Sequence, residues 1–224
     1  AASDVYKRQL LAAVLKKSPS DNNFSLRKLP ALIKTPSLWG IYLLTLVAIS
    51  GHFTAYSYIE PFLSRIAGLG NNAITVVLTL FGAVDLVGSF IFSRHYNNNV
   101  ETFFKMAVAG LCFCLLMLLP ASCTEWSAFL QCMLWGLSIN FFNLSFQSEI
   151  IRHAPQGTAV AMSIYSGIYN VGIGTGALVG GSVCDGIGIR YIGYVGGAIA
   201  LAAVIYCIRH VVPVLRRATA GAEI

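Results

Sequence analysis

Six apolar runs, each about 20 residues long, make up most of this chain and limit its fold more than any other feature of the sequence. A helix of that length crosses the hydrocarbon core of a bilayer. Only 11% of the residues are charged, against about 25% in soluble domains. The sequence therefore predicts an all-α membrane protein with six transmembrane helices, at about 38–60, 73–93, 102–120, 126–150, 158–184 and 189–208.

Lysine and arginine are concentrated in alternate connections between these runs. Short cytoplasmic loops of membrane proteins carry an excess of both residues. The basic positions lie before the first run and after the second, fourth and sixth runs: Lys16, Lys17, Arg27, Lys28, Lys34, Arg94, Lys105, Arg152, Arg209, Arg216 and Arg217. Only Arg65 and Arg190 belong to the other connections. This predicts a multi-pass protein with both ends of the six-helix unit in the cytoplasm.

The chain divides into four segments. Residues 1–8 read as a translated sequencing adaptor and are predicted not to be native. Residues 9–36 combine a short apolar stretch, ended by Lys16 and Lys17, with a polar linker, which is typical of the end of a preceding membrane helix. Residues 37–212 form the six-helix unit, and residues 213–224 a cytoplasmic tail. We therefore expect a further membrane half before this one.

Polar side chains inside the runs follow a period of three helices. The first, second, fourth and fifth runs carry them, whereas the third and sixth carry almost none. Polar groups inside a membrane normally face the bundle interior or a wet cavity. The pattern thus predicts peripheral third and sixth helices, a polar site among the others, and an internal 3+3 repeat of the kind found in one large transporter fold.

Three segments carry a resemblance to a known family. Residues 52–62 (HFTAYSYIEPF) resemble the seventh helix of drug:proton antiporter-type major facilitator transporters, in the branch of the bacterial sugar efflux and arabinose efflux permeases. Gln147 with Ala154-Pro155, and residues 170–174 with Gly180-Gly181, resemble the tenth and eleventh helices of that branch. The resemblance covers residues 10–212. It implies that the chain is the carboxy-terminal six-helix half of a twelve-helix fold in the bacterial cytoplasmic (inner) membrane. It also implies that the missing amino-terminal half is a partner of this one.

His52, Tyr56 and Glu60 lie along one stripe of the first run, because they are spaced four residues apart. His52 is a candidate for substrate binding or proton exchange. A neutral histidine bonded to a neighbouring helix is the alternative. Glu60, beside Pro61, is either a proton-coupling residue at a cavity rim or an interfacial residue.

Asp85 lies near the centre of the second run, where an unpaired carboxylate is costly. We expect it either to carry a proton or, as a neutral acid, to hydrogen-bond between helices.

Asn140, Asn143 and Gln147 share one face of the fourth run, and Asn170 lies in the fifth. Amides both donate and accept hydrogen bonds, which suits an uncharged polyhydroxy ligand. They also join helices in membranes. These four residues, with His52 and Tyr56, are the predicted substrate-binding set.

Gly172, Gly176 and Gly180 recur every four residues, a spacing that allows helices to approach closely. This segment is predicted to pack helices. It lacks the lysine of a phosphate-binding loop.

The remaining features restrict the function. The basic residues form no patch with stackable aromatic side chains, so no nucleic-acid partner is expected. The six cysteines show neither a CxxC pair nor histidines at metal spacing, so no metal or cofactor is expected; a Cys123–Cys184 disulfide is the less favoured alternative to free thiols.

The absence of a nucleotide-binding motif leaves an ion gradient as the energy source. The favoured function is proton-coupled efflux of sugars or similar small solutes. The alternatives are a multidrug efflux antiporter of the same fold, a membrane-embedded enzyme and a channel. An enzyme would need a nucleophile with its base or a metal site, so the chain is predicted not to be one.

Overall fold

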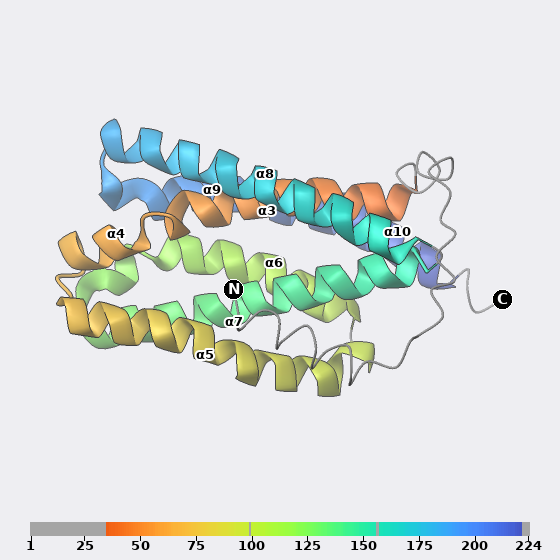
Figure 1. The fold of residues 1–224 in the computed structure, drawn as a ribbon, viewed down its shortest axis with the longest axis horizontal. Coiled ribbons are helices and arrows are strands. Elements are labelled where there is room, and N and C mark those ends of the chain that lie inside the picture. Colours follow the sequence, from red (N-terminus) through yellow and green to blue (C-terminus); the bar gives the residue numbers. More distant parts are fainter. Residues whose placement is uncertain (1–34, 99, 156, 221–224) are drawn as a thin grey trace, which may run out of the picture.

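A computed structural model describes residues 35–98, 100–155 and 157–220, which are predominantly α-helical (Figure 1). The predictions for residues 1–8 and for most of 9–36 therefore lie outside the described residues. The helices are α3 (Pro36–Tyr56), α4 (Ile59–Arg65), α5 (Asn71–His95), α6 (Val100–Met117), α7 (Glu125–His153), α8 (Thr158–Asp185), α9 (Ile192–Tyr206) and α10 (Val212–Ala220). A π-helical turn, Cys207–Val211, joins α9 to α10, so the segment predicted as a tail begins within a helix.

The helix ends follow from local chemistry. α3 has Pro36 at its first position, where the missing N–H costs nothing. The chain turns between α4 and α5 at Gly68, whose φ of 70° suits glycine best. α7 begins with a capping box, in which the Thr124 hydroxyl accepts a hydrogen bond from the Ser127 backbone N–H at 3.2 Å.

The first predicted helix is interrupted, which corrects the expectation of one helix over 38–60. α3 ends at Tyr56 and α4 begins at Ile59. Pro61 explains the break, because its ring clashes with the carbonyl group four residues earlier, that of Ser57, and it has no N–H to donate. The two helices still form one apolar segment of 30 residues, Pro36–Arg65.

Among the described residues, five segments are long and apolar enough to cross a membrane: Pro36–Arg65, Asn71–His95, Val100–Met117, Glu125–His153 and Ile189–Arg216. α8, with 28 residues, is long enough but is not among these segments. Its first half carries serine, tyrosine and asparagine side chains, and its second half is rich in glycine.

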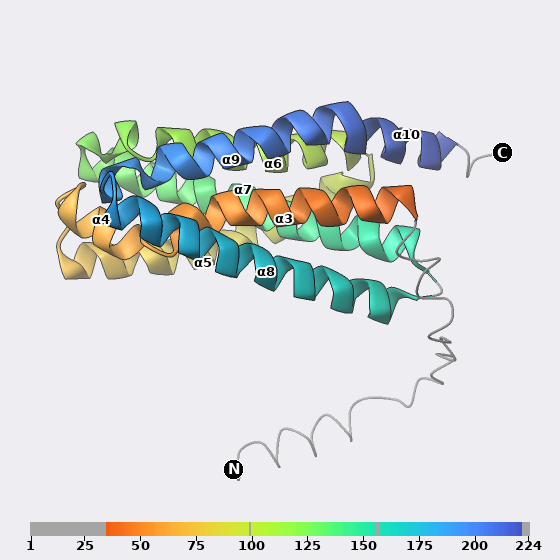
Figure 2. The same ribbon diagram turned by 90° about the horizontal axis from the view of Figure 1, so that it is seen from above.

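The helices form three layers of two. Figure 2 shows α6 beside α9 on one side, α7 and α3 in the middle, and α5 and α8 on the opposite side. α3 packs against α8 and α9, α7 packs against α5 and α6, and α6 meets α9. These main contacts are preserved when α3, α5 and α6 are exchanged with α7, α8 and α9 respectively, whereas the smaller contacts α7–α8, α8–α9 and α3–α6 have no counterpart of similar size.

The two outer layers differ in what they leave open. α6 and α9 contact each other, whereas α5 and α8 flank an open face over α3 and α7. Only 17% of the apolar window of α5 is buried, against 67% in the α3–α4 segment. α5 therefore has a large surface available to a further partner or to lipid.

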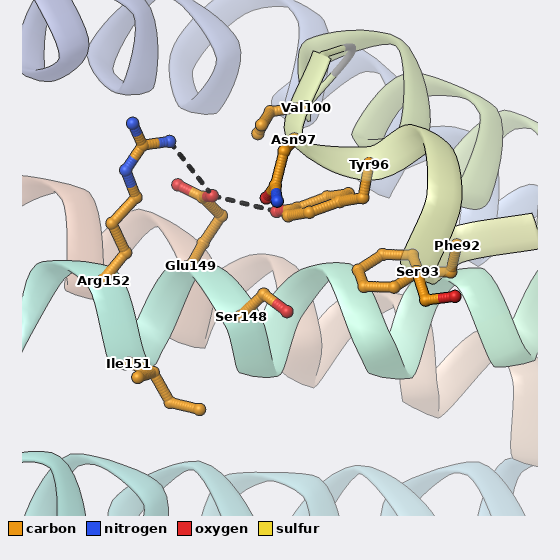
Figure 3. A pocket seen from close by; sticks show the side chains of 9 residues that line it. All are labelled: Phe92, Ser93, Tyr96, Asn97, Val100, Ser148, Glu149, Ile151 and Arg152. Carbon is orange, nitrogen blue, oxygen red and sulfur yellow. Dashed lines mark hydrogen bonds and ion pairs between the residues drawn. The ribbon is translucent and has the colours of Figure 1, made fainter. Parts of the chain in front are cut away.

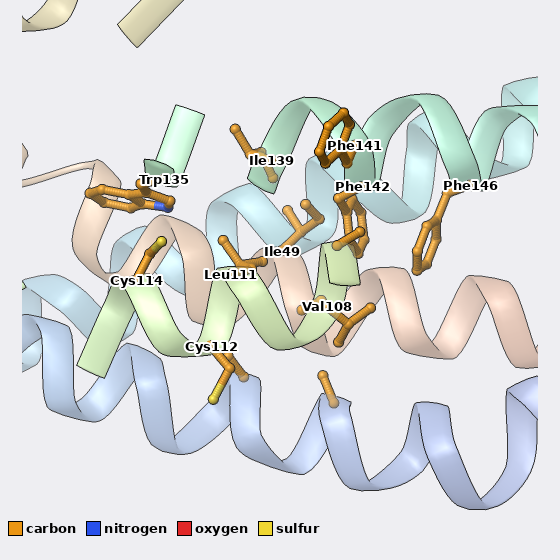
Figure 4. Close-up of a cluster of buried hydrophobic side chains, with 14 of the residues drawn as sticks. Ile49, Val108, Leu111, Cys112, Cys114, Trp135, Ile139, Phe141, Phe142 and Phe146 are labelled. Carbon is orange, nitrogen blue, oxygen red and sulfur yellow. The ribbon is translucent and has the colours of Figure 1, made fainter. Parts of the chain in front are cut away.

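Aromatic side chains fill the core between α6 and α7 (Figure 4). Phe146 stacks on Phe142, with ring centroids 3.8 Å apart, and on Phe104 at 4.3 Å. Lipid tails are as apolar as these rings, so close packing, not transfer from water, is what holds such helices together.

α8 lies against α3 along a row of small residues. A Cβ atom added at Gly176 would lie 2.5 Å from the Ser50 carbonyl oxygen, one at Gly180 would lie 2.4 Å from the Thr54 carbonyl oxygen, and one at Gly172 would lie 2.9 Å from the Ile49 side chain. At both ends of this contact a tyrosine hydroxyl of the α3–α4 segment donates to a carbonyl of α8: Tyr42 to Ala161 at 3.0 Å and Tyr58 to Ala177 at 3.1 Å.

Candidate functional site

A small cavity of about 270 Å³ lies between α7 and α8. We call it the α7–α8 cavity. Its lining consists of Asn143 and Gln147 from α7 and Tyr165, Ser166, Tyr169 and Asn170 from α8. The spacings of three and four residues place each set on one face of its helix. Three of the predicted substrate-binding residues, Asn143, Gln147 and Asn170, thus meet in one place.

The lining offers free hydrogen-bonding groups and no carboxylate, ammonium or guanidinium group. Asn170 donates to the Ser166 carbonyl at 2.8 Å, which leaves its side-chain oxygen free. Gln147 has no hydrogen-bond partner among the described residues. The Asn143 side chain lies near the Tyr169 hydroxyl. Such a surface suits a neutral ligand that both donates and accepts.

The lining residue Tyr165 carries a buried hydroxyl. Tyr165 is only 4% exposed, yet its hydroxyl has no hydrogen-bond partner in the described part of the chain. A buried polar atom without a partner costs free energy, and such groups are rare. This buried, unpartnered hydroxyl belongs to a residue that lines the α7–α8 cavity.

Aromatic rings connect this cavity to the middle of the bundle. Tyr56 stacks on His52 at 5.1 Å and lies 5.5 Å from Phe81 and 6.0 Å from Trp135, all between ring centroids. Phe53 lies 6.5 Å from Tyr169 of the cavity. Rings of α3, α5, α7 and α8 therefore form one continuous aromatic cluster: His52, Phe53, Tyr56, Phe81, Trp135, Tyr165 and Tyr169.

His52 is buried in this cluster, with 3% of its surface exposed. The indole N–H of Trp135 donates to its Nδ1 at 3.0 Å. Nδ1 is then an acceptor, so the ring proton of a neutral His52 is on Nε2. The structure thus contains the interhelical contact that the sequence left open, while proton exchange at His52 stays a prediction.

Asn140 and Asp85 lie away from the α7–α8 cavity. The Asn140 amide donates to the Asp85 backbone carbonyl at 3.4 Å and rests against Gly88, between α5 and α7. The Asp85 side chain is exposed. The position of Asn140 is that of an amide that joins two helices. The role of Asp85 as a proton carrier stays a prediction.

Glu60 lines a second cavity, of about 550 Å³, at the α4 end of the bundle. We call it the α4–α5 cavity. Asn71, Ile74, Thr75, Leu78 and Thr79 of α5 complete its lining.

A third cavity, of about 570 Å³, lies at the α10 end between α5 and α7 and is drawn in Figure 3. Glu149 is only 2% exposed there. It accepts a hydrogen bond from the Tyr96 hydroxyl at 2.9 Å. Arg152 and His153 lie 3.7 and 3.5 Å from its carboxylate oxygens. The buried carboxyl thus joins the end of α5 to the end of α7.

Sequence reasoning missed Glu149 and Trp135. Glu149 stands at the end of an apolar run beside Arg152 and His153, where an acid reads as an exposed boundary residue. The three-residue and four-residue spacing to these two bases was the available signal. Trp135 reads as a lipid-facing or core residue, because nothing in its neighbourhood marks a histidine 83 positions away as its partner.

All six cysteines are free, including Cys123 and Cys184. Within the described ranges, no group of three or more His, Cys, Asp or Glu side chains is placed to hold a metal ion.

Comparison with known proteins gives curated relatives for most of this chain. No protein-family model matches the chain. Curated relatives include the probable sugar efflux transporters of Helicobacter acinonychis (strain Sheeba) and Helicobacter pylori (strain ATCC 700392 / 26695). Each is 44% identical over 197 residues, which cover 88% of this chain and 50% of the relative. The chain thus spans about half the length of these relatives and is similar to half of a probable sugar efflux transporter.

Proposed function

We propose that this chain is one half of a proton-coupled secondary transporter that exports sugars or similar neutral solutes across a bacterial cytoplasmic membrane. The observation that carries the proposal is the α7–α8 cavity. It combines amides, an unpartnered buried tyrosine hydroxyl and neighbouring aromatic rings, with no charged side chain in its lining. Sugars present hydroxyls to amides and apolar C–H faces to rings, so they match both features.

The architecture supports a major facilitator half. The interchangeable contacts of α3, α5 and α6 with those of α7, α8 and α9 are what an internal 3+3 repeat produces. In this proposal α8 is the sixth spanning helix. Its polar face meets the substrate, which explains why α8 is not among the five most apolar segments.

A second half supplies the rest of the site. The matched 197 residues cover only half of the curated relatives that are named as sugar efflux transporters. The open face of α5 and α8 is where we place the other half, so that substrate lies between the two and access alternates by rocking. The α10 end, with Arg94, Arg152 and Arg209, faces the cytoplasm.

Multidrug efflux is the second candidate, and the aromatic cluster around Tyr56 favours it, because such rings also bind apolar drugs. Inverted membrane vesicles with an acidified lumen distinguish the two. The complete transporter is expected to accumulate radiolabelled glucose, and a protonophore should abolish the accumulation.

Vesicles lacking the transporter are the control. Accumulation of ethidium without glucose would instead support the multidrug function. If neither compound accumulates while the transporter is present and folded, the proposed function is wrong.

A further inference from the structure

The α4–α5 cavity has an unusual balance of hydrogen-bonding groups. Thr75 donates its hydroxyl to the Asn71 carbonyl at 2.9 Å, and Thr79 donates its hydroxyl to the Thr75 carbonyl at 2.7 Å. Both hydroxyl hydrogens are therefore used within α5, and only the oxygen lone pairs remain for a ligand.

Glu60 adds to the acceptors. Its side chain has no hydrogen-bond or ion-pair partner among the described residues, although it is the only charged group in the lining. A carboxylate accepts hydrogen bonds at up to four positions and donates none. The Asn71 amide supplies the donors of this lining. The cavity is therefore rich in acceptors, which suits a ligand that carries several hydroxyl donors.

The same cavity has an apolar side. Ile74 and Leu78 come from the same helix and alternate with Thr75 and Thr79 in the lining. A pyranose ring has polar edges and C–H faces, so it matches a surface that places acceptors beside aliphatic side chains. A hydrated metal cation would have no use for the aliphatic part.

Position on the helix links this cavity to the interior. Asn71, Thr75, Thr79 and Asp85 lie toward one side of α5, which leads from the α4 end to the middle of the bundle. Each of these side chains is exposed in this half. They form a polar stripe along α5.

We propose that the α4–α5 cavity is a second sugar subsite, at the outer mouth of the transport path, which holds the substrate hydroxyls as the sugar leaves. This inference rests on the proposed function and on the cytoplasmic placement of the α10 end. Glu60 and Thr79 act in it as hydrogen-bond acceptors for sugar.

Vesicle assays on the complete transporter can measure sugar binding at each face of the membrane separately. Right-side-out vesicles are loaded with radiolabelled glucose, and unlabelled glucose is added outside as an inhibitor of efflux. The subsite predicts that Glu60→Gln raises the external inhibition constant about tenfold, and that Thr79→Val raises it about threefold to tenfold. The internal glucose concentration that half-saturates efflux should change less than twofold.

Two variants serve as matched controls. Glu125→Gln removes an exposed carboxylate at the start of α7, and Thr102→Val removes an exposed hydroxyl at the start of α6; neither residue lines a described cavity. Both should leave the external inhibition constant unchanged. Thr79→Val keeps the test decisive if Glu60→Gln does not fold.

The other outcomes contradict the subsite in distinguishable ways. An unchanged external constant in both variants, or equal changes on both faces, would rule it out. Loss of gradient-driven transport in Glu60→Gln with an unchanged external constant would assign Glu60 to proton coupling instead. If the wild-type protein exports no glucose, the proposed function itself fails, whereas failure in the variants alone removes only this inference.

Discussion

The indole nitrogen of Trp135 on α7 and Nδ1 of His52 on α3 are 3.0 Å apart, in a hydrogen bond that joins the two middle-layer helices. α3 and α7 otherwise make few contacts with each other. The hydrogen bond also fixes the tautomer of His52 and the position of the ring on which Tyr56 stacks. It therefore links helix packing to the aromatic cluster.

A double-mutant cycle with Trp135→Phe and His52→Leu should give a coupling energy of about 0.6–3 kcal/mol. Trp135→Phe keeps an aromatic ring but leaves a buried acceptor without its donor. The free energy of unfolding of the complete transporter in mixed detergent micelles is the quantity to measure. Strictly additive effects would mean that the hydrogen bond contributes nothing.

Replacing Gly176 with alanine should destabilise the protein by about 1–3 kcal/mol, because the new Cβ meets the Ser50 carbonyl of α3 and the helices must separate. Gly174→Ala is the control on the same helix, since no atom lies within 4 Å of its added Cβ. The control should be neutral or slightly stabilising, because alanine favours helix. Thermal unfolding in detergent is the measurement. Equal losses of stability in both variants would count against close packing at Gly176.

Tyr96→Phe should lower the free energy of unfolding by about 1.5–3 kcal/mol, the usual range for a hydrogen bond to a charged group. The change leaves the buried Glu149 carboxyl without its closest donor. Tyr191→Phe, at an exposed tyrosine, should have little effect. If both variants melt alike, the Tyr96–Glu149 contact does not stabilise the α10 end.

Cysteine labelling tests the orientation. A cysteine at Asn97, in a cysteine-free background, should resist a membrane-impermeant maleimide added to intact cells, because that end carries the basic residues. A cysteine at Asn71 should react, since this exposed residue opens α5 at the opposite end. The reverse pattern would overturn the proposed topology.

Much of the fold follows from the sequence because a bilayer demands long apolar helices. The run predicted at 158–184 corresponds closely to α8, Thr158–Asp185. The break after Tyr56 was missed, although Pro61 gave the signal, because an apolar run continues through the break. The π-helical turn at Cys207–Val211, which packs against α3 and α6, was not predicted, because the apolar run gives no local signal for it.

The candidate site, like the fold, could be predicted from the sequence only in part. Periodicity correctly groups Asn143 with Gln147, which share the α7–α8 cavity. It also groups Asn140 with them, but that side chain contacts α5 instead, because adjacent positions on one helix face can meet different neighbours. Partners such as Trp135 for His52 depend on how two helices cross, and the spacing within one helix does not determine that crossing.

Glucose affinity and thermal stability, measured together on Asn143→Leu and Asn140→Leu in the complete transporter, test the sugar site most directly. Asn143 lines the α7–α8 cavity, and Asn140 joins α7 to α5. We predict that Asn143→Leu weakens glucose binding about tenfold or more, the effect of about 1–3 kcal/mol from an unsatisfied polar partner, with little loss of stability. Asn140→Leu should lower the melting temperature and leave affinity nearly intact. Unchanged glucose affinity in Asn143→Leu, or an equal loss of affinity in both variants, would contradict a sugar site in this cavity.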